Sequence, residues 1–300
     1  MTRSDISKLK KLKKYPRWVT IVLIIIFISY AAFSYFKENP LVPSLKPSDD
    51  EIIVHSIDVG QGDCTIITSK AGNIIIDAGT GEAESHIRSY IKSLGIEKFE
   101  YAIFTHPHED HIGGADMIMK EFAVNNVILP GVTHTSVTFS KMLDAIEASD
   151  AEIIEAVPGS IYSVGDIRML ILAPNSKKYD ELNDYSVVVK LEYFENSFMF
   201  TGDAEKLSEN EIIKKYSISL LDCDVLKVGH HGSTTSNSEQ FINAVSPDIA
   251  IISCGKDNEY GHPHREIKKL LNDMGINILR TDELGDISFR CNGNTIEVIE

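Results

Sequence analysis

Nine consecutive residues, from His106 to Gly114, carry three histidines and an aspartate in the order His-Pro-His-Glu-Asp-His-Ile-Gly-Gly. The residues before them, 101–105, form a short apolar run that predicts a buried strand. Residues 115–121, which follow them, predict a helix. The four polar side chains are therefore expected on a loop between a strand and a helix.

The side chains of this loop are of the types that bind transition metals. Imidazole nitrogens and carboxylate oxygens are ligands of zinc and, in some sites, of iron or manganese. His106 and His108 are two residues apart on extended backbone, so both are expected to point the same way and bind one ion. Asp110 and His111 are expected to bind a second ion beside it. A solvated loop rich in histidine is the alternative, and four ligands at this spacing argue against it.

The charge of the chain is divided unevenly. Residues 1–36 contain seven basic groups and one acidic group, whereas residues 37–300 contain 22 basic and 43 acidic groups, a net charge of −21. Such a domain repels polyanions at long range, so a broad DNA-binding face is not expected. The four cysteines contain no Cys-x-x-Cys pair, which argues against a cysteine zinc site, and nothing in the sequence requires a disulfide.

The N-terminal part predicts a membrane anchor. Residues 18–36 are nineteen residues without a charge, close to the length that spans a bilayer, and a basic segment at 1–17 precedes them. Basic segments stay in the cytoplasm, so the C-terminal domain is expected outside the cell. Residues 37–50, with three prolines, predict a linker before a domain at 51–300. A signal peptide that is cleaved, leaving a secreted domain, is the alternative.

The flanking sequence carries a resemblance. His106-x-His108-x-Asp110-His111 resembles the signature of the metallo-β-lactamase superfamily. The segments 58–63, 76–79, 183–186, 201–203 and 227–233 resemble the hydrolase domain of ComEC-type DNA-internalisation competence proteins. The resemblance covers about residues 51–300. It implies two sheets with helices on their outer faces, a four-layer αββα sandwich, and the pattern of short strands and helices along the chain is consistent with that architecture.

A two-metal hydrolase needs about six protein ligands and a shared water. Asp203 follows an apolar strand and a glycine, and the resemblance assigns it the role of bridging both ions, although Gly-Asp after a strand is also a common turn. His231, followed by Gly-Ser, is expected to complete the second site. His230 is then expected to contact substrate or to donate a proton.

One ligand position departs from the lactamase pattern, which has a further histidine between the first motif and Asp203. His134 is the only histidine there, and it lies too close to the first motif. We expect Asp184 to substitute as ligand, with Asn183 and Ser186 as alternatives. Two zinc ions are the expected cofactors, and an oxygen ligand would favour manganese, or a single ion, as the alternative. The departure also argues against β-lactam hydrolysis.

Further polar residues have weaker signals. Asp77 is expected to orient a ligand histidine, because metal-bound imidazoles commonly hydrogen-bond to a carboxylate. His262 is expected to reach a phosphate, His264 to begin a helix, and Asp63 either to touch the ligand loop or to sit in a turn.

These expectations combine into a function. We predict a membrane-anchored, metal-dependent hydrolase whose activated water attacks a phosphodiester, possible substrates being nucleic acid or a phosphorylated envelope component. Asp110, Asp203 and His230 are the predicted catalytic residues. A phosphorylcholine or teichoic-acid esterase and a non-catalytic metal-dependent module of DNA uptake are the alternatives. No protein partner is evident from the sequence.

Overall fold

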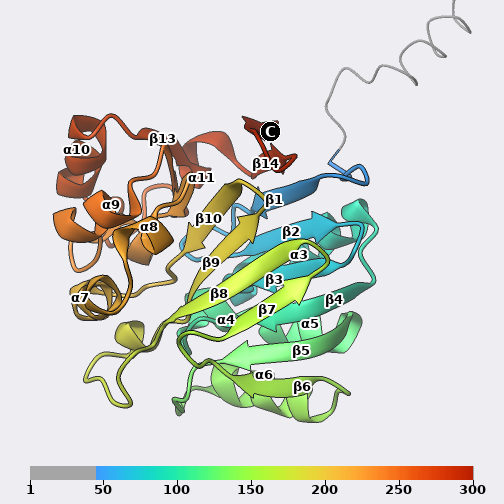
Figure 1. The fold of residues 1–300 in the computed structure, drawn as a ribbon. Helices are drawn as coiled ribbons and strands as arrows, with labels where there is room; N and C mark the ends of the chain where they lie inside the picture. The colour runs from blue at the N-terminus through green and yellow to red at the C-terminus, as the bar shows by residue number, and fades with distance from the viewer. Residues whose placement is uncertain (1–44, 300) are drawn as a thin grey trace, which may run out of the picture. The chain divides into compact units, whose positions relative to one another are not determined.

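Two β-sheets face each other in the computed structural model, which describes residues 45–299 (Figure 1). These residues belong to one compact unit, Leu45–Glu300. The predicted basic segment and anchor, and most of the predicted linker, lie outside the described residues, so they stay predictions. Among the helices of the described part, none has the length and apolar character needed to cross a bilayer.

The first sheet has eight strands in the order β15-β14-β1-β2-β3-β4-β5-β6. Strands β3, β4, β5 and β6 are parallel to one another, and the others pair antiparallel. The strands are β1 Ile52–Ser56, β2 Thr65–Ser69, β3 Asn73–Ile76, β4 Lys98–Ile103, β5 Ala123–Leu129, β6 Glu152–Glu155, β14 Ile287–Cys291 and β15 Ile296–Val298.

The second sheet has seven strands in the order β13-β12-β11-β10-β9-β8-β7. Strands β10 to β13 run parallel, and β7, β8 and β9 pair antiparallel. The strands are β7 Ile161–Val164, β8 Ile167–Ala173, β9 Val188–Tyr193, β10 Asn196–Phe200, β11 Val225–Lys227, β12 Ile249–Ile252 and β13 Asn277–Arg280.

Alternating apolar residues build three hydrophobic layers, because successive side chains of a strand point to opposite faces. Ile74 and Ile76 of β3 pack between the sheets, whereas Ile75 packs against helices outside the first sheet. In β10, Phe198 packs between the sheets and Met199 packs under the helices of the second sheet. The described residues therefore form the two-sheet α/β sandwich that the motifs predicted.

Helices cover the outer face of each sheet (Figure 1). The first sheet carries α3 Glu84–Leu94, α4 Glu109–Ile112, α5 Ala115–Glu121 and α6 Val137–Glu147. The second carries α7 Lys206–Lys215, α8 Ile218–Leu221, α9 Glu239–Val245 and α10 Arg265–Asp273, and a short α11, Thr281–Leu284, follows β13. The short α4, α8 and α11 were not predicted from periodicity, which needs a longer window to detect a helix.

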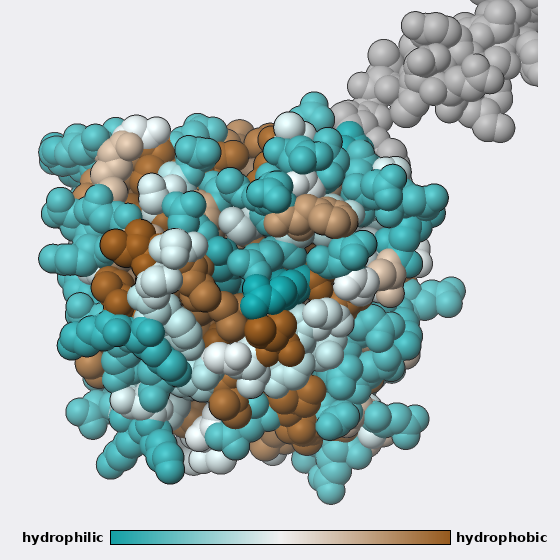
Figure 2. Space-filling view, in the orientation of Figure 1, coloured by the Kyte–Doolittle hydropathy of each residue, from teal (hydrophilic) through white to brown (hydrophobic). Residues whose placement is uncertain are grey.

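The surface in the same orientation is mostly hydrophilic, with hydrophobic residues gathered toward the middle of the face (Figure 2). Several exposed apolar side chains belong to the edge strands, among them Ile153 of β6 and Ile161 of β7.

Candidate metal centre

The predicted ligand loop follows β4, which ends two residues earlier than the sequence suggested, at Ile103. Asp77, at the end of β3, holds the start of this loop. Its carboxylate accepts hydrogen bonds from the backbone N–H and the hydroxyl of Thr105, both at 2.8 Å. Parallel neighbouring strands end at the same edge of a sheet, so the loops after β3 and β4 meet there.

The two glycines that end the motif allow these loops to touch. A Cβ on Gly113 would lie 2.2 Å from the backbone nitrogen of Gly81, and one on Gly114 would lie 2.6 Å from the carbonyl oxygen of Ala78. Any side chain at either position would force the two loops apart. The Ile-Gly-Gly tail therefore sets the position of the short helix α4, on which Asp110 and His111 lie.

The second sheet contributes Asp203 and His231 from the ends of its parallel strands β10 and β11. His230 and His231 both have positive φ, 50° and 52°, in the left-handed region that non-glycine residues rarely adopt. Strain of this kind persists only where surrounding structure enforces it, and it is common at functional sites. Here Asn237 holds the turn, accepting from the N–H of Gly229 at 2.9 Å and donating to its carbonyl at 2.8 Å.

Four side chains converge on one point and are here called the four-ligand cluster: Asp110, His111, Asp203 and His231. His111 Nε2 lies 3.2 Å from Asp203 Oδ1 and 3.9 Å from Asp110 Oδ2. His231 Nε2 lies 3.2 Å from Asp110 Oδ2 and 3.6 Å from Asp203 Oδ2. Ligands of a tetrahedral zinc ion stand about 3.3–3.6 Å from one another. The cluster therefore has the dimensions of a metal site.

The ring orientation of both histidines fits the same role. His111 Nδ1 lies 2.7 Å from the Asp77 carboxylate, and His231 Nδ1 lies 2.9 Å from the carbonyl oxygen of Ser253. Because a carbonyl oxygen only accepts, Nδ1 of His231 carries the hydrogen, so Nε2 is the ring nitrogen that can bind either a proton or a metal ion. Nε2 faces the Asp110 carboxylate at 3.2 Å, and either form of positive charge on Nε2 offsets the charge of that carboxylate. Second hydrogen bonds of this kind are typical of metal-bound histidines.

The electrostatics of the cluster also favour added positive charge. Burial lowers the pKa of His231, but the carboxylates of Asp203 and Asp63 outweigh burial and raise that pKa to about 9. Burial likewise opposes a charge on His111, and Asp203 and Asp77 nevertheless raise its pKa well above the ordinary value. Both Asp203 Oδ1 and His111 Nε2 are buried without a hydrogen-bond partner. These observations agree with a divalent cation as the natural occupant.

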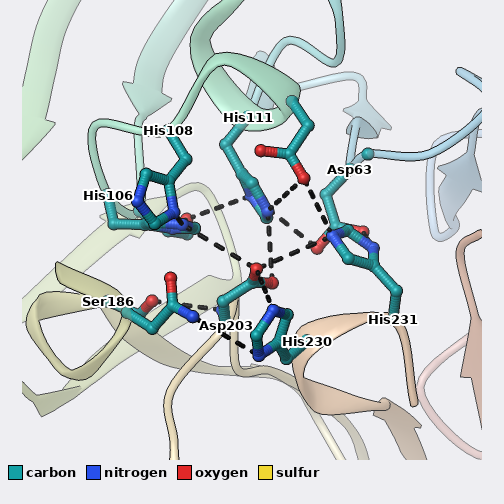
Figure 3. A network of polar contacts seen from close by, with 12 residues as sticks. Asp63, His106, His108, His111, Ser186, Asp203, His230 and His231 are labelled. Carbon is teal, nitrogen blue, oxygen red and sulfur yellow. Dashed lines mark hydrogen bonds and ion pairs between the residues drawn. The ribbon is translucent and has the colours of Figure 1, made fainter. Parts of the chain in front are cut away.

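A second group lies on the other side of Asp203 and consists of His106 and His108 (Figure 3). His106 Nε2 is 3.0 Å from His108 Nδ1 and 3.8 Å from Asp203 Oδ2. Burial lowers the pKa of both histidines, so both rings are neutral and offer lone pairs. Within residues 45–299, clusters of three or more close ligand atoms do not include this pair. This pair therefore offers fewer close ligand atoms than the four-ligand cluster.

The carboxylate of Asp184, the expected substitute ligand, points to the start of α7, where Oδ1 accepts from the N–H groups of Glu205 and Ser208, both at 3.2 Å. It satisfies helix N–H groups that have no partner inside the helix. Asn183 is the residue of this turn that lines the cavity, and Ser186 Oγ accepts from the backbone N–H of Asp203 at 3.1 Å.

The remaining histidines are distributed around the cluster. His230 Nε2 lies 3.7 Å from Asp203 Oδ2, and its Nδ1 lies 3.0 Å from Thr235 Oγ1 and 3.4 Å from Glu205 Oε1. His262 has its ring 5.5 Å from that of His230. His264 precedes α10 and accepts from the N–H of Thr234 at 2.9 Å, as expected for a residue at a helix start.

His134, which the sequence argument set aside, lies near the first group, with its ring 6.4 Å from that of His108.

Lys227 is a residue that sequence reasoning missed. It lies in β11 with only 4% of its surface exposed, and it forms a buried ion pair with Asp63. Burial raises the pKa of Asp63, but Lys227, His231 and His111 together outweigh burial and lower that pKa to about 2. Asp63 Oδ1 lies 3.5 Å from His231 Nδ1, so this pair borders the four-ligand cluster. The presence of a lysine inside an apolar strand was the sequence feature that could have identified it.

A cavity of about 330 Å³ opens over both groups. Of the ten described residues that line it, none is a lysine or an arginine: Gln61, His108, Glu109, Asp110, Asn183, Asp203, His230, His231, Tyr260 and His262. An anionic substrate in this cavity would therefore depend on bound cations for charge neutralisation.

Known proteins resemble this chain over most of its length. ComE operon protein 3 of Bacillus subtilis is 32% identical over 79% of this chain and 33% of its own length. Recombination protein 2 of Haemophilus influenzae is 33% identical over 73% of this chain and 26% of its own length. Competence protein ComA of Neisseria gonorrhoeae is 27% identical over 80% of this chain and 32% of its own length. The chain thus spans about a third or less of these relatives.

Solved structures agree with the fold. CmlA, a diiron β-hydroxylase from Streptomyces venezuelae, aligns with a TM-score of 0.55 at 14% identity, over 82% of this chain and 55% of its own. YhfI from Bacillus subtilis, a metallo-β-lactamase fold protein, aligns with a TM-score of 0.55 at 9% identity, over 80% of this chain and 100% of its own. At these identities the likeness concerns the fold alone.

The family model described as the Metallo-beta-lactamase superfamily matches residues 57–256, which include every ligand of the four-ligand cluster. The chain belongs to the metallo-β-lactamase superfamily, as its motifs predicted, and this membership implies a metal-dependent hydrolase.

Proposed function

We propose that this protein is a phosphodiesterase that uses two divalent cations, zinc in the first place and manganese as the alternative. The observation that carries the proposal is the position of Asp203. Its carboxylate lies within 4 Å of ring nitrogens from both groups, His106 on one side and His111 and His231 on the other. A carboxylate shared in this way is what a two-metal site requires.

The residues divide into holding and reacting roles. His106 and His108, with Asn183, would hold one cation. The four-ligand cluster would hold the other cation, and its member Asp110 also faces the cavity. When bound, the cations lower the pKa of a water molecule toward neutrality and offset the charge on the phosphate oxygens. The Asp77 carboxylate and the Ser253 carbonyl keep the two ligand imidazoles in the productive tautomer.

Proton transfer is assigned to His230. During hydrolysis an oxygen of water bonds to phosphorus, the bond to the leaving oxygen breaks, and that oxygen needs a proton. His230 lines the cavity, and Glu205 and Thr235 lie beside its Nδ1, which leaves Nε2 directed toward the reaction site. His262, on the same wall, is proposed to contact a phosphate oxygen.

Two features support nucleic acid as the substrate and the cell surface as the location. The relatives include proteins named for competence and recombination, and the apolar run at 18–36 would tether the domain to the membrane. Both are part of the proposal. Protease treatment of intact cells that display the full chain tests the topology, and retention of residues 51–300 after treatment contradicts an external domain.

The activity test uses the full chain in detergent, loaded with Zn²⁺ or Mn²⁺. We expect hydrolysis of single-stranded DNA and of a chromogenic phosphodiester, with none of a phosphorylcholine ester. Asp203→Asn should abolish turnover, whereas Asp150→Asn, at an exposed position, should retain it. Hydrolysis of the phosphorylcholine ester alone would favour the envelope esterase. Metal binding without turnover on any substrate would favour a non-catalytic module.

A further inference from the structure

An exposed aromatic ring stands at the mouth of the cavity. Tyr260 lines the cavity, yet 60% of its surface is exposed. Its ring stacks on that of His262, with centroids 5.6 Å apart and an angle of 20° between the planes. The His262 ring in turn lies 5.5 Å from His230 and 6.2 Å from His231. The two rings thus form a stack, here called the Tyr260 platform, in which His262 lies toward the reacting groups and Tyr260 is exposed to solvent.

The loop that carries this platform is held in place. Asn258 Nδ2 donates to the carbonyl oxygens of Gly255 and His262, at 2.8 and 2.6 Å, and its Oδ1 accepts from the N–H of His262 at 3.0 Å. Gln61 Nε2 lies 3.3 Å from His262 Nδ1. A loop held in this way loses little conformational entropy when a ligand covers it.

The chemistry of the cavity limits how a substrate can be recognised. Lysine and arginine are absent from its described lining, and the domain carries a net negative charge. Cations at the ligand groups can neutralise one phosphate, but they cannot distinguish between the chemical groups that the phosphate connects. The remaining part of a substrate must therefore be recognised by uncharged contacts. A tyrosine ring with an open face is the surface on which a nucleobase stacks, whatever its sequence.

We infer that the Tyr260 platform stacks the nucleobase next to the reacting phosphodiester, which makes single-stranded nucleic acid the substrate class. The inference rests on the proposed phosphodiesterase function and assigns its specificity to Tyr260.

The test compares two single strands with the same phosphodiester backbone. One is an oligothymidylate, and in the other every base is removed by substitution with tetrahydrofuran residues. The measured quantity is the ratio of kcat/KM for the base-bearing strand to that for the abasic strand, with the full chain and saturating Mn²⁺. Stacking of one base predicts a ratio of about 5 to 100.

Substitutions then locate the preference. Tyr260→Leu should bring the ratio to within about twofold of one, and Tyr260→Phe should keep it, because a phenyl ring still stacks. Phe194→Leu, at an aromatic residue that is 64% exposed in the β9–β10 turn, should also keep it. A wild-type ratio near one, or an unchanged ratio in Tyr260→Leu, overturns the inference while the phosphodiesterase function stands. If neither strand is cleaved, the proposed function fails and the inference fails with it.

Discussion

Removing the ammonium group of Lys227 tests how much this charge stabilises the protein by compensating the buried carboxylate of Asp63. Lys227→Met keeps the length of the side chain and leaves the Asp63 carboxylate without its partner. The side chains of Lys227 and Asp63 are only 5% and 9% exposed, so solvent cannot replace the lost interaction. Loss of one member of a buried ion pair costs about 3–5 kcal/mol, because a charge stays buried without compensation.

Urea unfolding of the full chain, followed by far-UV circular dichroism with a chelator present, measures this cost without a contribution from metal binding. We expect the unfolding midpoint of Lys227→Met to fall by about 1–2 M. The double variant Lys227→Met/Asp63→Asn should recover more than half of the loss, because neither charge of the pair remains.

Lys269→Met is the matched control, since Lys269 and Asp273 form an ion pair with side chains 70% and 61% exposed. It should change the free energy of unfolding by less than about 0.5 kcal/mol. A Lys227→Met variant as stable as the wild type would refute the reasoning. A double variant no more stable than the single one would show that the cost comes from packing rather than from charge.

Three further predictions follow from the structure. Zn²⁺ should raise the melting temperature of the wild type by mass action, and Asp203→Asn should lose most of that shift. Scanning calorimetry at increasing Zn²⁺ concentrations measures both. Asp184→Ala should lower stability by about 0.5–2 kcal/mol through the start of α7 with unchanged metal content by mass spectrometry, whereas Asn183→Ala should weaken metal binding. Burial lowers the pKa of His55 from 6.5 to about 3. Only the unfolded chain takes up this proton between those values, so stability should fall by about 1.4 kcal/mol per pH unit below pH 6.5. The fall should be shallower in His55→Asn but not in His86→Asn, whose ring is 47% exposed; equal slopes in all three proteins would contradict this assignment.

The sandwich itself was predictable because each of its layers has a local pattern. Short apolar runs in strands such as β3 and β10, helical periodicity in α3 and the glycines between elements are all visible within short windows. The ligand loop after β4 was equally visible, because four ligand residues fall within six positions. Pairing of strands far apart in sequence, such as β1 with β14, has no local signal and was not predicted.

Which residue of a polar turn faces the site was decided by tertiary structure. Asn183 and Asp184 are neighbours in a short 3₁₀ turn, and the sequence favoured the carboxylate as the better metal ligand. The start of α7 instead engages Asp184 through two N–H groups, which turns Asn183 toward the cavity. The sequence could not show this, because the position of α7 relative to this turn depends on how the two pack on the second sheet.

The sequence alone determined the kinds of ligand, their positions at strand ends and the family to which they belong, because these are local patterns. Tertiary structure decided the Lys227–Asp63 pair, the approach of both His230 and His231 to Asp203 Oδ2, and the position of Tyr260 at the cavity. The Lys227–Asp63 pair, for example, joins segments 164 residues apart in the chain. Such distances are set only when the loops at the ends of both sheets close on one another.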